Sequence, residues 1–220
     1  WQVSTTFPDA PTNLRTINGT PQSFGTGAGA TAKTDLQWDH PIPSGTLTGT
    51  NVQRALWGGG CGVFATIATV PKGGAGDDQY SNTSLVPNTA YCYQAISSNA
   101  GGDSPPSSPP LIVTTPDVVP VAPSGLAASV PSPSTSQANL TWTDNSGGLA
   151  WGNETSFRIR RCQGTSCDPT PLSNDAGGSN ANTTASSNLA LTGDTTYRYC
   201  VAARNALGDS PCSNIVTVTT

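Results

Sequence analysis

The sequence predicts an all-β protein built from two tandem sandwiches, and three observations lead to this prediction. The first is an internal repeat, because residues 85–105 align without a gap with residues 191–211 and end in the same Gly-Asp-Ser-Pro. The second is a succession of short runs separated by clusters of Gly, Pro, Asn and Ser. The third is that these runs alternate with the period of a strand and not that of a helix. A repeat of this length marks one structural unit, so the chain is expected to hold two.

The first copy of the unit opens with a Pro-x-x-Leu sequence at Pro11, and a Leu-x-Trp run follows that ends at Trp38. A Gly-rich insertion, Gly25–Ala30, separates its first two strands. The runs are rich in β-branched and aromatic residues, which favour strands, and Trp38 is expected to lie in the core. Strands are expected over residues 36–38, 52–54, 65–67, 91–97 and 112–114.

The second copy opens with the same Pro-x-x-Leu sequence at Pro123. Successive side chains of a strand point to opposite faces, so Leu140 and Trp142 are expected to face the core. By the same rule Tyr197 and Tyr199 face the core. Strands are expected over residues 140–142, 157–160, 189–191, 197–203 and 215–218.

Changes in composition along the sequence predict the domain boundaries. Residues 1–7 form a strand-like N-terminal segment, residues 8–116 the first domain, residues 117–122 a Pro-rich linker and residues 123–220 the second domain. Prolines in and beside the linker make it short and stiff, so the two sandwiches are expected to form a semi-rigid rod. The first segment is similar to the closing strand of a domain, and it belongs either to a longer array or to an edge of another copy.

Both copies carry the sequence Leu-x-x-x-Thr-x-Tyr, then Asn-Ala-x-Gly-Asp-Ser-Pro and a Thr-rich last strand. Together with Pro-x-x-Leu and Leu-x-Trp, these motifs resemble the fibronectin type III domain, an immunoglobulin-like sandwich, of the kind found in secreted bacterial surface proteins. The resemblance implies a tyrosine corner at Tyr91 and at Tyr197, where the hydroxyl bonds upstream backbone. We expect Gly-Asp-Ser-Pro to form a turn with its Gly at positive φ and its Asp bonded to local backbone.

Six cysteines in a chain rich in Ser and Thr and poor in Lys predict disulfides and an oxidising compartment. Residues equidistant from a hairpin centre face each other, which predicts one bridge around Ala206 and another across the turn at Gly164. The third strand lies beside the sixth in the resembling fold, which brings the remaining two cysteines to one end of a sheet. The expected pairs are Cys61–Cys92, Cys162–Cys167 and Cys200–Cys212.

Several function classes are excluded by charge and composition. The net charge is −4, without the basic clusters that nucleic-acid binding needs. No apolar run is long enough to span a membrane. The only histidine, His40, is expected in a solvated loop, as are Asp77 and Asp78, so no catalytic residue, metal site or cofactor is expected.

Two kinds of surface remain as candidates for binding. Four arginines are expected on one outward sheet face, where they are either paired or solvated, or else form an anionic-ligand patch. They are Arg158, Arg160, Arg198 and Arg204. Apolar residues outside the expected core are candidates for an interface, and these residues are Trp1, Val3, Phe7, Trp57 and Trp151. Two of them, Trp57 and Trp151, are also candidates for sugar binding.

The sequence therefore predicts a non-catalytic, extracellular structural or adhesive module at a cell surface, including the repeating subunit of a filament. The alternative is a carbohydrate-binding or spacer module of a secreted polysaccharide-degrading enzyme. The expected partners are other copies of the chain or neighbouring domains of a longer chain, and surface glycans.

Overall fold

The computed structural model describes residues 6–40, 47–73 and 78–220. Among these residues every regular element is a strand, apart from two short 3-10 turns at Gly27–Gly29 and Leu172–Asn174. The chain divides into two compact units. The first holds the residues up to Phe24 and Thr31–Pro116, and the second holds Gly25–Ala30 and Asp117–Thr220.

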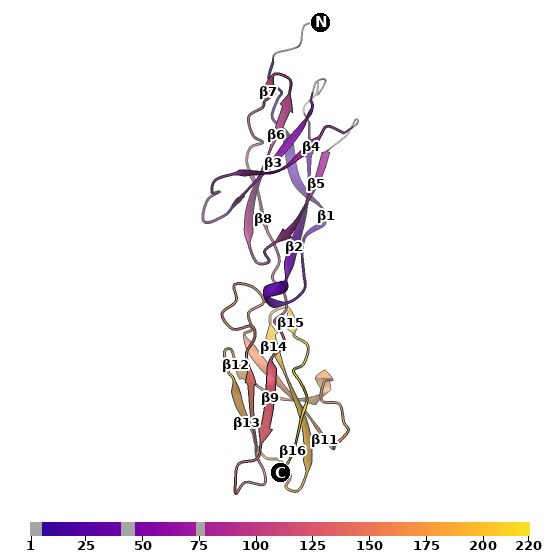
Figure 1. Ribbon diagram of the computed structural model, residues 1–220, viewed down its shortest axis with the longest axis vertical. Helices are drawn as coiled ribbons and strands as arrows, with labels where there is room; N and C mark the ends of the chain where they lie inside the picture. Colours follow the sequence, from indigo (N-terminus) through magenta and orange to yellow (C-terminus); the bar gives the residue numbers. More distant parts are fainter. Residues whose placement is uncertain (1–5, 41–46, 74–77) are drawn as a thin grey trace. The chain divides into compact units, whose positions relative to one another are not determined.

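The first unit consists of two antiparallel sheets (Figure 1). One sheet has the order β1-β2-β5, and the other has the order β4-β3-β6-β7 with β8 also paired to β6. The strands of the first sheet are β1 (Thr12–Phe24), β2 (Thr31–Asp39) and β5 (Asp78–Leu85). Those of the second are β3 (Gly49–Leu56), β4 (Ala65–Pro71), β6 (Ala90–Asn99), β7 (Gly102–Asp103) and β8 (Leu111–Thr114).

The second unit repeats this plan (Figure 1). One sheet has the order β9-β10-β13, and the other has the order β12-β11-β14-β15 with β16 also paired to β14. The strands are β9 (Ser124–Ser129), β10 (Ala138–Thr143), β11 (Ser156–Gln163), β12 (Asp175–Asn180), β13 (Ala185–Asn188), β14 (Thr196–Asn205), β15 (Gly208–Asp209) and β16 (Val216–Thr219). The predicted fold class, all-β with two tandem immunoglobulin-like sandwiches, is confirmed.

Each sandwich has its own core around one tryptophan. Trp38 is fully buried in the first unit, beside Leu36 and Tyr93. Trp142 is buried in the second, where its ring packs against Phe157 at 5.4 Å between centroids. The expected core role of both tryptophans is confirmed, and it follows from the alternation of inward and outward side chains along β2 and β10.

Both tyrosine corners are present. The backbone N–H of Val86 donates to the Tyr91 hydroxyl at 3.0 Å, and the N–H of Thr192 donates to the Tyr197 hydroxyl at 3.0 Å. Thr115 completes the first corner, since its hydroxyl donates to the Val86 carbonyl. These bonds tie the connection before β6 or β14 to the start of that strand, and they satisfy backbone groups that leave the ladder.

The repeated Gly-Asp-Ser-Pro does not form the turn expected of it, because its Gly-Asp forms the short strands β7 and β15 and the turn precedes the motif, at residues 100–101 and 206–207. Gly102 and Gly208 have φ values of 129° and 138°, which favour glycine. The carboxylates of Asp103 and Asp209 accept from side chains of the preceding strand. The expectation that they bond local backbone is therefore wrong, because the hairpin places a polar side chain of β6 or β14 directly opposite.

The structure corrects the sequence at the edges of the sheets. The strand expected over residues 189–191 is wrong, because Ala190 has φ 58° and the pairing strand is β13. Two edge strands, β5 and β12, were not expected from the sequence. Edge strands face solvent on one side and are often polar or interrupted. Their sequences, DQYSNTSL and DAGGSN, accordingly lack a clear apolar alternation.

The tyrosine corners are expected to stabilise each unit separately. Tyr91→Phe or Tyr197→Phe leaves a backbone N–H without its acceptor and should lower the free energy of unfolding by about 1–3 kcal/mol. Urea denaturation followed by circular dichroism measures this loss. Tyr80→Phe makes the same chemical change outside the corners, and an equal loss there would contradict the role of the corner bonds.

Stability is also expected to fall in alkali through one buried phenol. Burial raises the pKa of Tyr93 to about 12, although the Asn82 amide donates to its oxygen at 2.9 Å. An unfolded tyrosine ionises near pH 10, so between about pH 10 and 12 the unfolded state loses this proton before the folded state does. The free energy of unfolding should therefore decrease with pH across this interval. Tyr93→Phe should flatten the slope in urea titrations, and an unchanged slope would contradict the assignment.

Candidate interaction surfaces and the disulfide frame

The six cysteines form the three predicted pairs. Cys61 bonds Cys92, Cys162 bonds Cys167 and Cys200 bonds Cys212. The Cα–Cα distances are 5.8, 6.1 and 5.7 Å, within the usual range for disulfides. The pairings follow from strand register, because Ala55 of β3 lies opposite Cys92 of β6 and Cys61 returns toward the same end of that sheet. Three disulfides fit an oxidising compartment.

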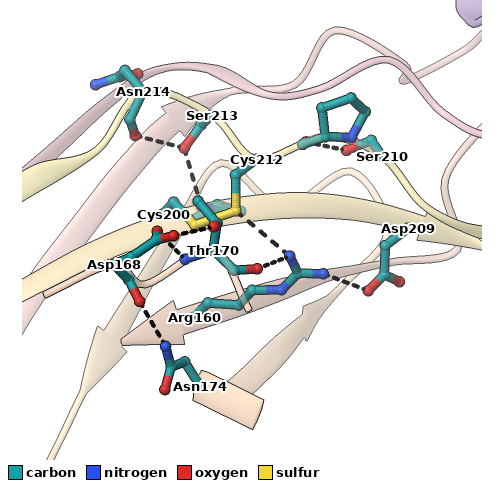
Figure 2. The surroundings of a disulfide bond; sticks show 12 residues. Arg160, Asp168, Thr170, Asn174, Cys200, Asp209, Ser210, Cys212, Ser213 and Asn214 are labelled. Carbon is teal, nitrogen blue, oxygen red and sulfur yellow. Dashed lines mark hydrogen bonds and ion pairs between the residues drawn. A yellow bond between two sulfur atoms is a disulfide. The ribbon is translucent and has the colours of Figure 1, made fainter. Parts of the chain in front are cut away.

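Arg160 is the centre of a polar cluster on the outer face of β11 and β14. It lies opposite Cys200 in the ladder, and the residue is only 6% exposed. Figure 2 shows its guanidinium between three partners: the Thr170 carbonyl at 2.6 Å, the Asp209 carboxylate at 2.8 Å and the Cys212 sulfur at 3.8 Å. The arginine therefore covers the Cys200–Cys212 disulfide and ties β11 to Asp209 of β15.

The other three predicted patch residues also have partners within the second unit. Arg158 pairs with Asp175, Arg204 donates to Asp209 at 2.9 Å, and Arg198 donates to the Cys167 carbonyl. Of the two alternatives, the structure agrees with paired arginines, because two carboxylates and two carbonyls accept hydrogen bonds from these guanidinium groups. These partners were not predicted from the sequence: Asp175 begins β12, Asp209 lies in β15, and the two carbonyls belong to the connection between β11 and β12.

An exposed apolar surface lies on the connection from β3 to β4, which we call the tethered loop (residues 56–64). Leu56 is 62% exposed, Trp57 40% and Val63 94%. The backbone of the loop is nevertheless held. The Trp57 N–H donates to the Ala90 carbonyl at 3.0 Å, and the Gly62 N–H donates to the Leu56 carbonyl at 3.0 Å. With the Cys61–Cys92 bond at its centre, the loop presents three apolar side chains from a fixed backbone.

The other predicted interface residues are placed differently. The Trp151 indole N–H donates to the Gly27 carbonyl at 2.8 Å, so its polar edge is engaged within the second unit. Phe7 is 68% exposed, and its ring rests on Gly102, where an added Cβ would come within 2.7 Å of the ring. Trp1 and Val3 lie outside the described residues. Of the three that the structure describes, Trp57 is the one that lies in the tethered loop, which also carries the exposed Leu56 and Val63.

His40 and Asp78 are not in solvated loops, contrary to expectation. Their side chains are only 3% and 6% exposed, with His40 Nε2 2.8 Å from Asp78 Oδ2. The Lys72 ammonium lies 3.8 Å from the other oxygen of Asp78. The contact joins the end of β2 to the start of β5, which pair in the same sheet. Asp77 lies outside the described residues.

Within residues 6–40, 47–73 and 78–220, no three His, Cys, Asp or Glu side chains gather as ligands of a metal ion. In the same part of the chain, no helix has the length and apolar character needed to cross a membrane.

No family model matches the chain, and no curated protein matches it. Solved structures with a similar arrangement include a two-domain fibronectin type III segment of chicken tenascin. It is 15% identical, covers 96% of this chain and all of its own, and has a TM-score of 0.44. The FN1-FN3 domains of chicken CNTN1 are 19% identical, with 97% of this chain and 68% of that chain covered and a TM-score of 0.41. Both neighbours are tandem fibronectin type III segments, and the likeness concerns the fold alone.

The Arg160 cluster is expected to matter more for stability than an exposed ion pair. Arg160→Met leaves the Thr170 carbonyl and part of the Asp209 carboxylate without a donor in a buried place, and it should cost about 3–5 kcal/mol. Arg158→Met removes a pair that is one-third exposed and should cost at most about 1 kcal/mol. Urea denaturation of both variants makes the comparison. Equal losses would contradict the central place of Arg160.

Proposed function

We propose that this chain is a non-catalytic, extracellular structural and adhesive module that serves as the repeating subunit of a cell-surface filament. The observation that carries the proposal is the tethered loop. Leu56, Trp57 and Val63 are each exposed, and the backbone that carries them is held by a disulfide. Large apolar side chains left exposed on a protein surface can mark sites of association.

The rigidity of the loop supports protein–protein contact. Association costs free energy when flexible segments must be ordered, and this cost is smaller when the backbone is already fixed. Large aromatic side chains such as Trp57 are also frequent anchors of interfaces. A disulfide-held apolar surface therefore suits a repeated contact between identical subunits.

The extracellular assignment is supported by the covalent frame and by composition. Three disulfides persist in oxidising compartments, and only 10% of the residues are charged. The fold itself does not choose a function, because the same sandwich serves many.

The alternative, a carbohydrate-binding or spacer module of a secreted polysaccharide-degrading enzyme, is favoured by one observation. Trp57 is 40% exposed and is followed in the sequence by three glycines, Gly58–Gly60, which carry no side chains. Trp151 is less suited to this role, because its indole N–H is bonded to Gly27. A sugar ring stacked on Trp57 would thus be the specific form of the alternative.

Sedimentation and electron microscopy of the native protein test the proposal. We expect assemblies of many copies, and Trp57→Ala with Val63→Ser should shift them to single chains without lowering the melting temperature. Leu172→Ser is the matched control, because Leu172 is 69% exposed but belongs to the second unit and is not part of the tethered loop. Native protein found only as single chains would contradict the proposal. Glycan-array binding that is lost in Trp57→Ala would instead support the alternative.

A further inference from the structure

The strand β4 forms an open edge of the first unit. It pairs with β3 and with no other strand of the described residues, and Figure 1 shows it at the margin of its sheet. Its sequence, ATIATVP, has no charged residue. Proteins commonly protect exposed edges with charge, because an unpaired edge is a template for another strand.

The backbone at the centre of this edge is directed outward. The Lys72 N–H donates to the Thr48 carbonyl at 3.0 Å, which makes these two residues a hydrogen-bonded pair. Such pairs alternate with non-bonded ones along an antiparallel ladder. Thr50–Val70 is therefore the next bonded pair, and Thr69, opposite Asn51, turns its N–H and C=O away from β3.

The side chains at the same edge are only partly covered. Ile67 and Val70 of β4, with Tyr80 of β5, pack against the core of the first unit but are not fully buried. Ile67 and Val70 belong to the edge strand of one sheet, and Tyr80 belongs to the edge strand of the other. A strand added to β4 would cover them with its own apolar side chains.

The corresponding edge of the second unit lacks these properties. β12 holds Gly177 and Gly178 at its centre and begins at Asp175, which pairs with Arg158. It has no large apolar side chain to be covered. The two edges thus form an internal comparison within one chain.

We propose that residues 1–5 of a second copy add to the open edge of β4 as an extra strand. This inference rests on the filament function proposed above and names a second contact between subunits, in addition to that of the tethered loop. In an extended segment Trp1, Val3 and Thr5 share one face. Trp1 and Val3 would lie over Ile67 and Val70, while the segment's backbone would pair with Thr69.

The geometry requires a second copy. The carbonyl of Thr6 accepts from the Asn99 amide at the end of β6, two strands away from β4. A new strand beyond β4 lies three strand spacings from β6, about 14 Å. Residues 1–5 span about 17 Å when extended. Within one copy, nearly all of this length would be used to reach the edge of β4, and almost no residues would remain to pair with it. From a neighbouring copy, the same length matches that of Ala65–Val70.

A peptide experiment tests the edge directly. The chain lacking residues 1–5 is mixed with a synthetic peptide of residues 1–7, and hydrogen exchange is measured at single amides. The Thr69 amide should become protected, while that of Gly177 in β12 should not change. Peptides N-methylated at successive positions should lose affinity with a period of two, because only alternate N–H groups of a strand face its neighbour. Protection confined to other strands, or no period, would overturn the inference.

Variants of the acceptor and the donor complete the test. Ile67→Lys should weaken peptide binding about tenfold, equal to about 1.4 kcal/mol, and Ser179→Lys in β12 should not. Val3→Glu in the peptide should weaken binding as strongly, without any change to the folded acceptor. Assembly that persists without residues 1–5, with no protection of Thr69, would overturn the edge contact and leave the filament standing. Protection of Thr69 in a protein whose native form is a single chain would support the edge contact and overturn the filament.

Discussion

Antiparallel pairing between β3 and β6, and between β11 and β14, fixes most of the features described. The register of the first pair sets Ala55 against Cys92, and that of the second sets Arg160 against Cys200. A slip by one residue would exchange every inward and outward side chain of these strands. The disulfides, the arginine cluster and the position of the tethered loop would then be lost together. The burial of alternate aromatic residues makes such a slip costly, so packing in the core also fixes which side chains face outward.

The two units share one arrangement of strands but carry different side chains on the outer face of the corresponding sheet. In the first unit Gln53 lies opposite Gln94, and their amides are hydrogen-bonded at 2.6 Å. In the second unit the corresponding pair is Arg160 and Cys200. A neutral amide pair has thus been exchanged for a buried cation above a disulfide. Such a cation needs a carboxylate nearby, and Asp209 supplies it.

The sequence was sufficient for features that depend on local order or on strand register. Trp38 and Trp142 could be placed in the core from alternation alone, and the Cys200–Cys212 pair from hairpin symmetry. The partners of charged groups could not be foreseen in the same way. Arg160 and Asp209 are 49 residues apart, and His40 and Asp78 are 38 apart, so only the folded sheets bring them together. Edge strands such as β12 were not predicted, because a strand that faces solvent on one side does not need an apolar pattern.

The disulfides also bear on how such a chain would mature during export. Each bond joins cysteines of the same unit, with sequence separations of 31, 5 and 12 residues. The Cys61–Cys92 bond needs nothing that follows Pro116, so the first unit can be oxidised while the second is still being delivered. Domains that emerge in order commonly fold in order. Because no bond crosses between units, sequential oxidation leaves no cysteine of the first unit waiting for a partner, which reduces the opportunity for mispairing.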